Sequence, residues 1–352
     1  MMALRAAFSQ VRESNGLLYT LAHRGFTAAA RKGADVPDVT AAFERAITPD
    51  VAQHLSDHGY AVVDGIFGKD VARQLRAEVV ELYERGLMRK NCTHLVKDNA
   101  TSLVEKSHVH EAELTLDANI QSAAPLCSSL NSDRTMATLL SLFMPQVTLD
   151  SQAIKLQYNA GGGGCFPVHL DSDEQLDGRR VTAIFYLNPD WHEGQGGQLR
   201  LYPFPSGPPL DLPPLEDRLV LFSSCRMPHR VMPATAPRCC FTIWMSQSRR
   251  RSFVRSAPSL ASLEPAAPPE QDPAAAVRFL MHPAVKQHVC KLVYGEEWAQ
   301  SLQESHAESA VREAMLQQHW REVDVIRRSL GKYLPTIERL RQGELRTRVE
   351  WF

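Results

Sequence analysis

Residues 151–188 read SQAIKLQYNAGGGGCFPVHLDSDEQLDGRRVTAIFYLN. Short apolar runs rich in Val, Ile, Phe, Leu and Tyr are separated here by Gly, Pro and Asp, and the same texture continues to Met245. Runs of this length between turn residues are typical of β-strands. We predict strands over 151–158, 165–171, 180–188, 197–203, 217–223, 228–233 and 239–246. So many strands in so short a segment favour an antiparallel barrel or jelly roll over a βαβ fold.

Helical patterns flank this β-rich segment on both sides. Residues 48–90 predict helix, strand and helix in turn, and Met136 to Phe143 predict another helix, whereas 91–130 are polar and loosely patterned. The chain is therefore expected to be of the α+β class. Its predicted regions are an N-terminal tail or transit segment over 1–40, a helix-rich flank over 41–150, the β-rich core over 151–248, a basic and then Pro/Ala-rich linker over 249–276, and a helical C-terminal extension over 277–352.

Composition excludes several classes of protein. The 352 residues are 44% hydrophobic and 22% charged, which is typical of a globular chain. Lys plus Arg number 39 against 40 Asp plus Glu, so net charge gives no argument for a nucleic-acid partner. No apolar stretch is long enough to predict a membrane span. Seven Cys without a Cys-x-x-Cys pair argue against a disulfide framework or a zinc site and favour a reducing compartment.

The N-terminal segment leaves the compartment open. Residues 1–34 carry five basic side chains and one acidic one, a bias seen in organellar transit peptides. The alternative is a mildly basic tail. Because no secretory signal is evident, we expect an intracellular protein, in the cytoplasm or nucleus, with a mitochondrial or other organellar location as the alternative.

The His169-Leu-Asp171 segment is the first candidate metal site. Side chains at i and i+2 leave the same face of a strand, so these two can hold one ion together. A His-x-Asp pair is expected about once by chance in such a chain, so it needs context. His306-Ala-Glu308 has a similar pattern but falls in a predicted helix, where positions i and i+2 do not face each other.

His229 and Arg238 supply that context, because each begins a predicted strand. Two His and one carboxylate on one face of an iron ion leave positions open, as in non-haem Fe(II) oxygenases. A 2-oxo acid with a distal carboxylate would need a fixed cation farther away, and Arg238 can supply a two-pronged one. The structural alternative is a His–Asp hydrogen bond and a salt bridge within a β-sandwich.

The stretch from Tyr158 to Trp244 resembles the 2-oxoglutarate and Fe(II)-dependent dioxygenases, and among them most the Egl nine-type prolyl hydroxylases. The matching segments are His169-Leu-Asp171, Asp177-Gly-Arg179, Val181-Thr-Ala-Ile-Phe-Tyr-Leu-Asn188, Asp190-Trp191, Gly196-Gly-Gln-Leu-Arg-Leu-Tyr-Pro203, Asp217-Arg-Leu-Val220, Pro228-His-Arg-Val231 and Arg238 to Trp244. This ordered series covers about a quarter of the chain and is more specific than three ligands alone.

The resemblance implies a double-stranded β-helix, a jelly-roll variant with flanking helices. It also implies His169, Asp171 and His229 as iron ligands and Arg238 as the partner of the 2-oxoglutarate distal carboxylate. The remaining residues that it assigns to the cosubstrate pocket are Tyr158, Tyr186, Thr242 and Trp244. The implied cofactors are Fe(II), 2-oxoglutarate and O2, with ascorbate as a reductant.

Two segments depart from the family pattern. The turn Gly161 to Gly164 is one residue longer than usual, which puts the alignment of Tyr158 in doubt. Residues 91–125, where the prolyl hydroxylases carry a substrate-covering loop, show no matching motif. Other features have plain structural explanations: His108 and His110 as surface residues, Trp191 as a packing residue, the basic run Arg249–Arg251 with Arg255 as a solvated segment, and Cys225, Cys239 and Cys240 as small core residues.

The leading hypothesis is hydroxylation of a prolyl residue in a protein or peptide substrate, coupled to conversion of 2-oxoglutarate to succinate. Arg rather than Lys at position 238 favours the Egl nine-type branch over the collagen-modifying one. Two alternatives stay open: a hydroxylase of a small molecule or nucleobase, and a non-catalytic module that senses iron or oxygen. The oligomeric state cannot be predicted from these residues.

Overall fold

The computed structural model describes residues 38–97, 100–114, 117–173, 177–248 and 263–352. The predicted tail or transit segment, up to residue 37, and the basic run Arg249–Arg251 with Arg255 lie outside the described residues. No helix in the described part of the chain has the length and apolar character needed to cross a bilayer.

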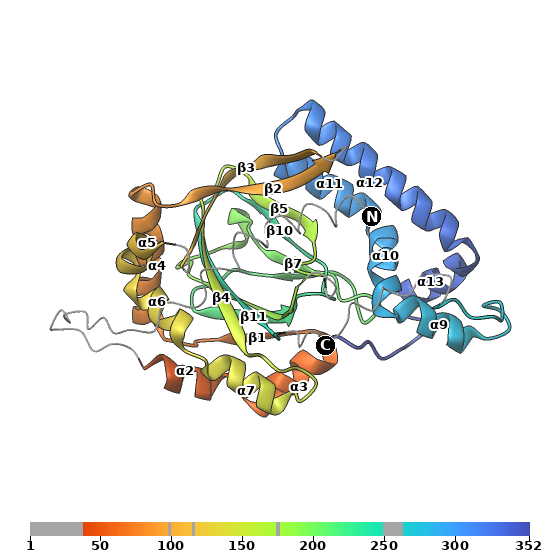
Figure 1. Ribbon diagram of the computed structural model, residues 1–352, viewed down its shortest axis with the longest axis horizontal. Coiled ribbons are helices and arrows are strands. Elements are labelled where there is room, and N and C mark those ends of the chain that lie inside the picture. Colours follow the sequence, from red (N-terminus) through yellow and green to blue (C-terminus); the bar gives the residue numbers. More distant parts are fainter. Residues whose placement is uncertain (1–37, 98–99, 115–116, 174–176, 249–262) are drawn as a thin grey trace.

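Two antiparallel sheets form the centre of the molecule (Figure 1). The larger sheet contains, in spatial order, β1 (Tyr60–Asp64), β9 (Arg218–Ser223), β6 (Arg179–Tyr186), β11 (Arg238–Ser246), β4 (Ser151–Asn159), β3 (Ala100–Glu113) and β2 (Arg89–Lys97). The smaller sheet contains β5 (Gly164–His169), β10 (His229–Ala234), β7 (Leu199–Leu201) and β8 (Leu210–Leu212). Every predicted strand of the core is present, and the predicted α+β, jelly-roll fold is confirmed.

Successive side chains of β11 point to opposite faces of the larger sheet. Cys239, Phe241 and Ile243 belong to the hydrophobic core between the sheet and the N-terminal helices. Cys240, between them, belongs to the second core, which lies between the two sheets. Residues that pair with Cys240 and its i±2 neighbours therefore point into the space between the sheets.

The N-terminal helices cover the outer face of the larger sheet (Figure 1). These are α2 (Val39–Ala46), α3 (Pro49–His58), α4 (Lys69–Glu84), α5 (Ala118–Ala123), α6 (Pro125–Ser132) and α7 (Thr135–Phe143). Thr48 accepts a hydrogen bond from the amide of Val51 and caps the start of α3, and Gly59 is the C-cap of this helix. A short 3-10 turn, η1 (Glu193–Gln195), precedes β7.

The flank predicted to be helix-rich also contains a long hairpin. β2 and β3 pair with each other, and β3 pairs with β4, so the hairpin extends the larger sheet. These strands were missed because their sequences are largely polar and lack the apolar alternation of the core strands. β8 was missed because it has only three residues.

The C-terminal extension is helical and begins earlier than predicted. It contains α9 (Pro273–Met281), α10 (Pro283–Val293), α11 (Gly295–Ser305), α12 (Ala310–Ser329), the 3-10 turn η2 (Gly331–Tyr333) and α13 (Leu334–Arg341). Asp272 accepts a hydrogen bond from the amide of Ala275 and starts α9 within the predicted linker. His306-Ala-Glu308 lies between α11 and α12, not inside a helix as predicted.

Helix α11 packs directly on the smaller sheet. The amide of Val168 on β5 donates to Ser301 Oγ at 3.0 Å, and the buried Arg230 on β10 forms an ion pair with the partly exposed Glu304. The hydroxyl of Tyr202 donates to Glu297 at 2.8 Å. Val168 and Arg230 are the neighbours of His169 and His229, so the extension holds the strands that carry both histidines.

Trp351 anchors the C-terminal segment in the core. It is 1% exposed, its carbonyl accepts a hydrogen bond from Ser223 Oγ at 2.6 Å, and Lys286 Nζ lies 3.5 Å from the centroid of its ring. A Cβ on Gly59 would meet the ring at 2.3 Å, and the positive φ of Gly59 also disfavours a side chain there.

Replacing Trp351 with Ala should therefore lower the free energy of unfolding by about 3–5 kcal/mol, the usual cost of removing a large buried aromatic side chain. Urea denaturation would measure the change. The control is Leu142→Ala, since Leu142 is 68% exposed and its loss should cost less than about 0.5 kcal/mol. Equal stability of the two variants would contradict the packing described here.

Candidate metal centre

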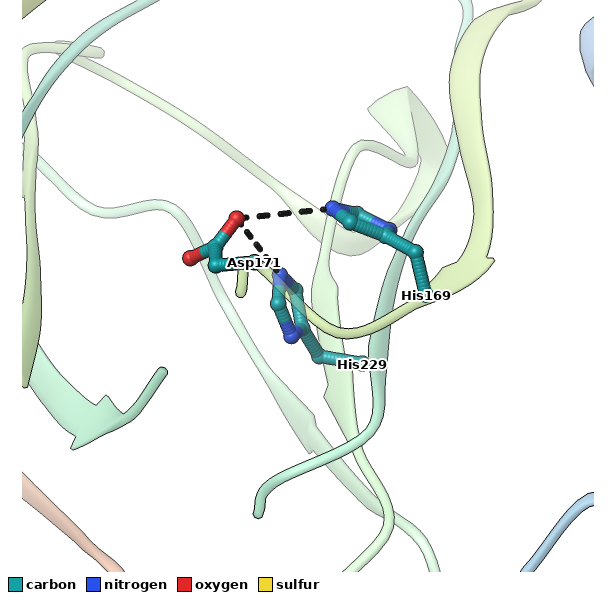
Figure 2. Close-up of side chains that lie close together, drawn as sticks. All are labelled: His169, Asp171 and His229. Atoms are coloured by element: carbon teal, nitrogen blue, oxygen red, sulfur yellow. Dashed lines mark ion pairs between the residues drawn. The ribbon is translucent and has the colours of Figure 1, made fainter. Parts of the chain in front are cut away.

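Three predicted ligands converge between the sheets. His169 ends β5, Asp171 follows two residues later, and His229 begins β10 directly opposite His169. Nε2 of His169 lies 3.6 Å from Asp171 Oδ1, and Nε2 of His229 lies 3.8 Å from the same oxygen (Figure 2). All three potential ligand atoms lie within 4.8 Å of one another.

Backbone carbonyls orient both imidazoles. Nδ1 of His169 lies 2.8 Å from the carbonyl oxygen of Pro167, and Nδ1 of His229 lies 3.1 Å from that of Met227. A proton on each Nδ1 satisfies these carbonyls and leaves the Nε2 lone pairs directed toward Asp171. Burial lowers the pKa of His229 to about 4, and nearby His169 acts in the same direction. His229 is therefore neutral at pH 7, as a metal ligand must be.

Asp171 is held as a carboxylate. Burial opposes its ionisation, but His229, His169 and Thr182 outweigh that effect and keep the pKa of Asp171 below its ordinary value. The hydroxyl of Thr182 on β6 lies 2.6 Å from Asp171 Oδ2, and it also lies 2.8 Å from Ser224 Oγ. Arg179 donates to the backbone carbonyl of Asp171 at 3.3 Å.

This donor set fits a ferrous ion. Two ligand atoms that each lie about 2.1 Å from one ion, with a right angle between their bonds to it, are about 3 Å apart. Small movements of the three side chains would therefore bring their ligand atoms to coordination distance. Two imidazoles and one carboxylate on a single face match the arrangement of non-haem Fe(II) oxygenases and leave the other face open. The side chain of His229 is 4% exposed and that of His169 is 35% exposed, so the open face is reached from the His169 side.

Arg238 and Tyr186 form a second polar group that faces the space between the sheets. Arg238 is 4% exposed, its Nε donates to the carbonyl of Gly197 at 2.9 Å, and its Nη1 lies 3.3 Å from Cys240 Sγ. The guanidinium carbon lies 5.0 Å from the centroid of the Tyr186 ring. Gly197 permits this packing, because a Cβ there would lie 2.9 Å from Arg238 Cδ.

The pair is suited to a carboxylate that enters between the sheets. Arg238 forms no ion pair with a carboxylate among the described residues, although a buried guanidinium is costly without one. The hydroxyl of Tyr186 is buried and has no hydrogen-bond partner in the described part of the chain, and burial raises the pKa of this group. The distal carboxylate of 2-oxoglutarate would satisfy both groups at once.

Thr242 and Trp244 also point into this cavity. They follow Cys240 at i+2 and i+4 on β11, and Trp244 pairs with Thr182 across the strands. The guanidinium of Arg179 lies 4.2 Å from the centroid of the Trp244 ring. These contacts place Trp244 beside the metal ligands and Thr242 between Trp244 and Arg238.

The assignment of Tyr158 to the cosubstrate pocket is wrong. Tyr158 pairs with Cys239, whose side chain faces the helices, and its ring stacks on Tyr83 of α4 at 4.0 Å between centroids. The next residue, Asn159, pairs with Arg238 and faces the cavity. The longer glycine turn explains the error, since a shift of one residue along a strand moves a side chain to the opposite face.

The other features keep structural roles. All described cysteines are free thiols, and burial raises the pKa of Cys239 to about 12, so it is not a nucleophile at pH 7. Trp191 donates from Nε1 to the carbonyl of Gly196 at 2.8 Å. His108 is exposed, and within the described residues neither it nor His110 joins a cluster of potential metal ligands.

Sequence reasoning missed several polar residues that face the cavity. Thr182 was read only as part of an apolar strand, although its hydroxyl holds Asp171. Lys155 and Gln157 face inward from β4, opposite Thr242 and Cys240. The alternation of polar Lys155, Gln157 and Asn159 with Leu156 and Tyr158 was the available signal.

Replacing Thr182 with Val should weaken metal binding by roughly 10- to 100-fold, because Asp171 loses the partner that orients it. Calorimetric titration with Mn(II) under anaerobic conditions would measure the dissociation constant. Thr40→Val is a matched control, since the Thr40 hydroxyl donates to Asp133 at 2.7 Å far from the cavity. Unchanged affinity in the Thr182 variant would show that this hydrogen bond is dispensable.

Known proteins share these features. Residues 155–246 match the 2OG-Fe(II) oxygenase superfamily. The chain is 34% identical over 225 residues to a "Hypoxia-inducible factor prolyl hydroxylase" of Caenorhabditis elegans and 30% identical over 203 residues to human "Egl nine homolog 1". These alignments cover 58% and 57% of this chain but 29% and 47% of the relatives, so the chain spans less than half the length of either.

A solved structure is similar over most of the chain. It belongs to a study of "prolyl 4-hydroxylases from Phytophthora capsici", with 30% identity, a TM-score of 0.69 and coverage of 89% of this chain and 97% of the other. That coverage extends beyond the catalytic core alone. With the facial arrangement of His169, Asp171 and His229, these similarities show that the chain belongs to the 2OG-Fe(II) oxygenase superfamily.

Proposed function

We propose that this protein hydroxylates prolyl residues in a protein or peptide substrate, with Fe(II), 2-oxoglutarate and O2. The observation that carries the proposal is the convergence of His169, Asp171 and His229 between the two sheets, where the buried pair of Arg238 and Tyr186 also lies. Substrate class is supported by similarity to named prolyl hydroxylases, one of them over nearly its whole length.

Each part of the cavity has a task. When bound, Fe(II) and 2-oxoglutarate would activate O2, which is the oxidant: one oxygen atom would enter the C–H bond and the other the succinate formed with release of carbon dioxide. His169, Asp171 and His229 would hold the ion from one side and leave positions for the cosubstrate and O2. Arg238 and Tyr186 orient the cosubstrate through its distal carboxylate. Apolar side chains between the sheets exclude water from the reacting centre.

The substrate reaches this centre past His169, the most exposed of the three ligands. Trp244, covered on one side by the Arg179 guanidinium, forms a flat wall beside it. A proline ring packs well on an aromatic face, so this wall suits the target side chain.

Incubation with a library of proline-containing peptides tests the proposal. With Fe(II) and 2-oxoglutarate present, we expect a mass gain of one oxygen atom on proline and one succinate formed per hydroxylation. Succinate that forms only with a metabolite or oligonucleotide would instead identify a small-molecule or nucleobase hydroxylase. Metal binding without any turnover would favour a non-catalytic sensor.

We also propose an intracellular location, in the cytoplasm or nucleus, which is supported by the free thiols of the described residues. Fractionation of cells that express the chain with a C-terminal tag would test it, and recovery in an organelle would favour the transit segment.

A further inference from the structure

Lys106 on β3 is a buried cation outside the set of residues that hold the ion and 2-oxoglutarate. It is 8% exposed, and its Nζ lies 4.1 Å from the centroid of the Phe166 ring. Apart from this ring, Nζ has no hydrogen-bond or ion-pair partner in the described part of the chain. A buried ammonium group is costly unless it is paired, so an unpaired one points to a missing anion.

The carboxylates of the same strand that face the cavity are already paired. Glu111 lies 2.9 Å from Lys155 Nζ and 3.3 Å from the Arg89 guanidinium, and it accepts a hydrogen bond from Asn91. Glu113 lies 3.0 Å from Arg89. Glu111 acts on Lys106 electrostatically, but it pairs directly with Lys155 and Arg89, so among the described residues no carboxylate forms an ion pair with Lys106.

The charge lies next to the metal centre. Phe166, which Lys106 contacts, has its ring centroid 6.3 Å from that of His169. Lys155, on the other side of the paired carboxylate, has its Nζ 4.9 Å from the centroid of the Trp244 ring. Through Phe166, Lys106 thus borders the space beside His169, the most exposed of the three ligands.

We propose that Lys106 is a carboxylate subsite that recognises an acidic side chain of the peptide substrate close to the target proline. This inference rests on the proposed function and names the substrate more narrowly. An extended peptide advances about 3.3 Å per residue, so the contact distances from His169 through Phe166 to Lys106 place the acid about one to three residues from the proline.

The environment favours a single carboxylate. Burial lowers the pKa of Lys106 to about 8, which still leaves the ammonium form predominant at pH 7, and a bound anion would stabilise that form. One ammonium group beside an aromatic wall can form one strong charge-assisted hydrogen bond with Glu or Asp. The distal carboxylate of 2-oxoglutarate has its own partners, Arg238 and Tyr186.

Paired peptides test the subsite. Each pair carries Glu or Gln at one of the three positions on either side of the target proline. With the wild-type protein, we expect kcat/KM for the Glu peptide to exceed that for the Gln peptide roughly 10- to 100-fold at one position. Lys106→Met keeps the apolar stem and should remove this ratio by slowing the Glu peptide alone.

Lys90→Met is the matched control. Lys90 lies on the same hairpin, but its side chain is 58% exposed and pairs with Glu105, so this variant should keep the wild-type ratio. Lys106→Arg keeps the charge and should retain part of the ratio.

The outcomes separate the two proposals. If no proline peptide of either kind is hydroxylated, the proposed function fails and the subsite fails with it. If Glu and Gln peptides react equally at all positions, or if Lys106→Met mainly raises the KM for 2-oxoglutarate, only the subsite is overturned.

Discussion

Replacing His229 with Ala should abolish peptide hydroxylation and weaken metal binding by more than about 100-fold. Loss of a hydrogen-bond partner behind a ligand already costs 10- to 100-fold, and here a ligand itself is lost. His229 is also the least exposed of the three ligands, so water cannot readily take its place without a rearrangement. Anaerobic titration with Mn(II) and mass spectrometry of treated peptides would measure the two effects separately.

His54→Ala provides the control for this substitution, because His54 is an exposed histidine on α3 outside the metal centre. The control should bind metal and hydroxylate peptides like the wild-type protein. Full hydroxylation by the His229 variant, at wild-type metal affinity, would remove the proposed centre from consideration.

Replacing Arg238 with Met should raise the KM for 2-oxoglutarate roughly 30- to 3,000-fold. The range follows from the 2–5 kcal/mol usually lost when one partner of a buried, hydrogen-bonded charge pair is truncated. The affinity for Mn(II) in the absence of 2-oxoglutarate should stay unchanged, because Arg238 lies six residues along β11 from Trp244, which pairs with Thr182 beside Asp171. Initial rates of succinate formation against 2-oxoglutarate concentration would measure the effect.

The same substitution should leave the protein without ligand at least as stable as the wild type. Without ligand, the Arg238 side chain contacts the Gly197 carbonyl, the Tyr186 ring and the thiol of Cys240, whose pKa is raised by burial, and all three are uncharged. Removal of a buried charge that no carboxylate neutralises is neutral or stabilising. Arg321→Met, on the exposed surface of α12, controls for loss of an arginine, and an equal KM in both variants would refute the role of Arg238.

Much of the core could be predicted because its strands are apolar and end at turn residues. The spacing of His169 and Asp171 was enough to predict a shared ion, together with the position of His229 at the start of another strand, although β5 ends at His169 and Asp171 lies just beyond it. Arg238 could be placed because it begins the strand after His229. The structure brings the three ligands within 4.8 Å of one another and directs Arg238 into the same space between the sheets.

The other features could not be predicted because they depend on which strands pair and in which register. The face on which Tyr158 lies follows from its pairing with Cys239, which the longer glycine turn concealed. The β2–β3 hairpin is largely polar, so its sequence resembles a surface loop. Lys106 belongs to that hairpin, and its isolation becomes visible only when the carboxylates around it are seen paired with other cations.

Helix α11 covers the edge of the smaller sheet. β5 is the outermost strand of the smaller sheet, and Ser301 on α11 accepts the amide hydrogen of Val168 there. A polypeptide truncated before the helical extension would expose unsatisfied backbone groups along this strand, a template for intermolecular pairing. Such a fragment should self-associate and precipitate even with every metal ligand in place, so the helices act as a built-in guard against aggregation.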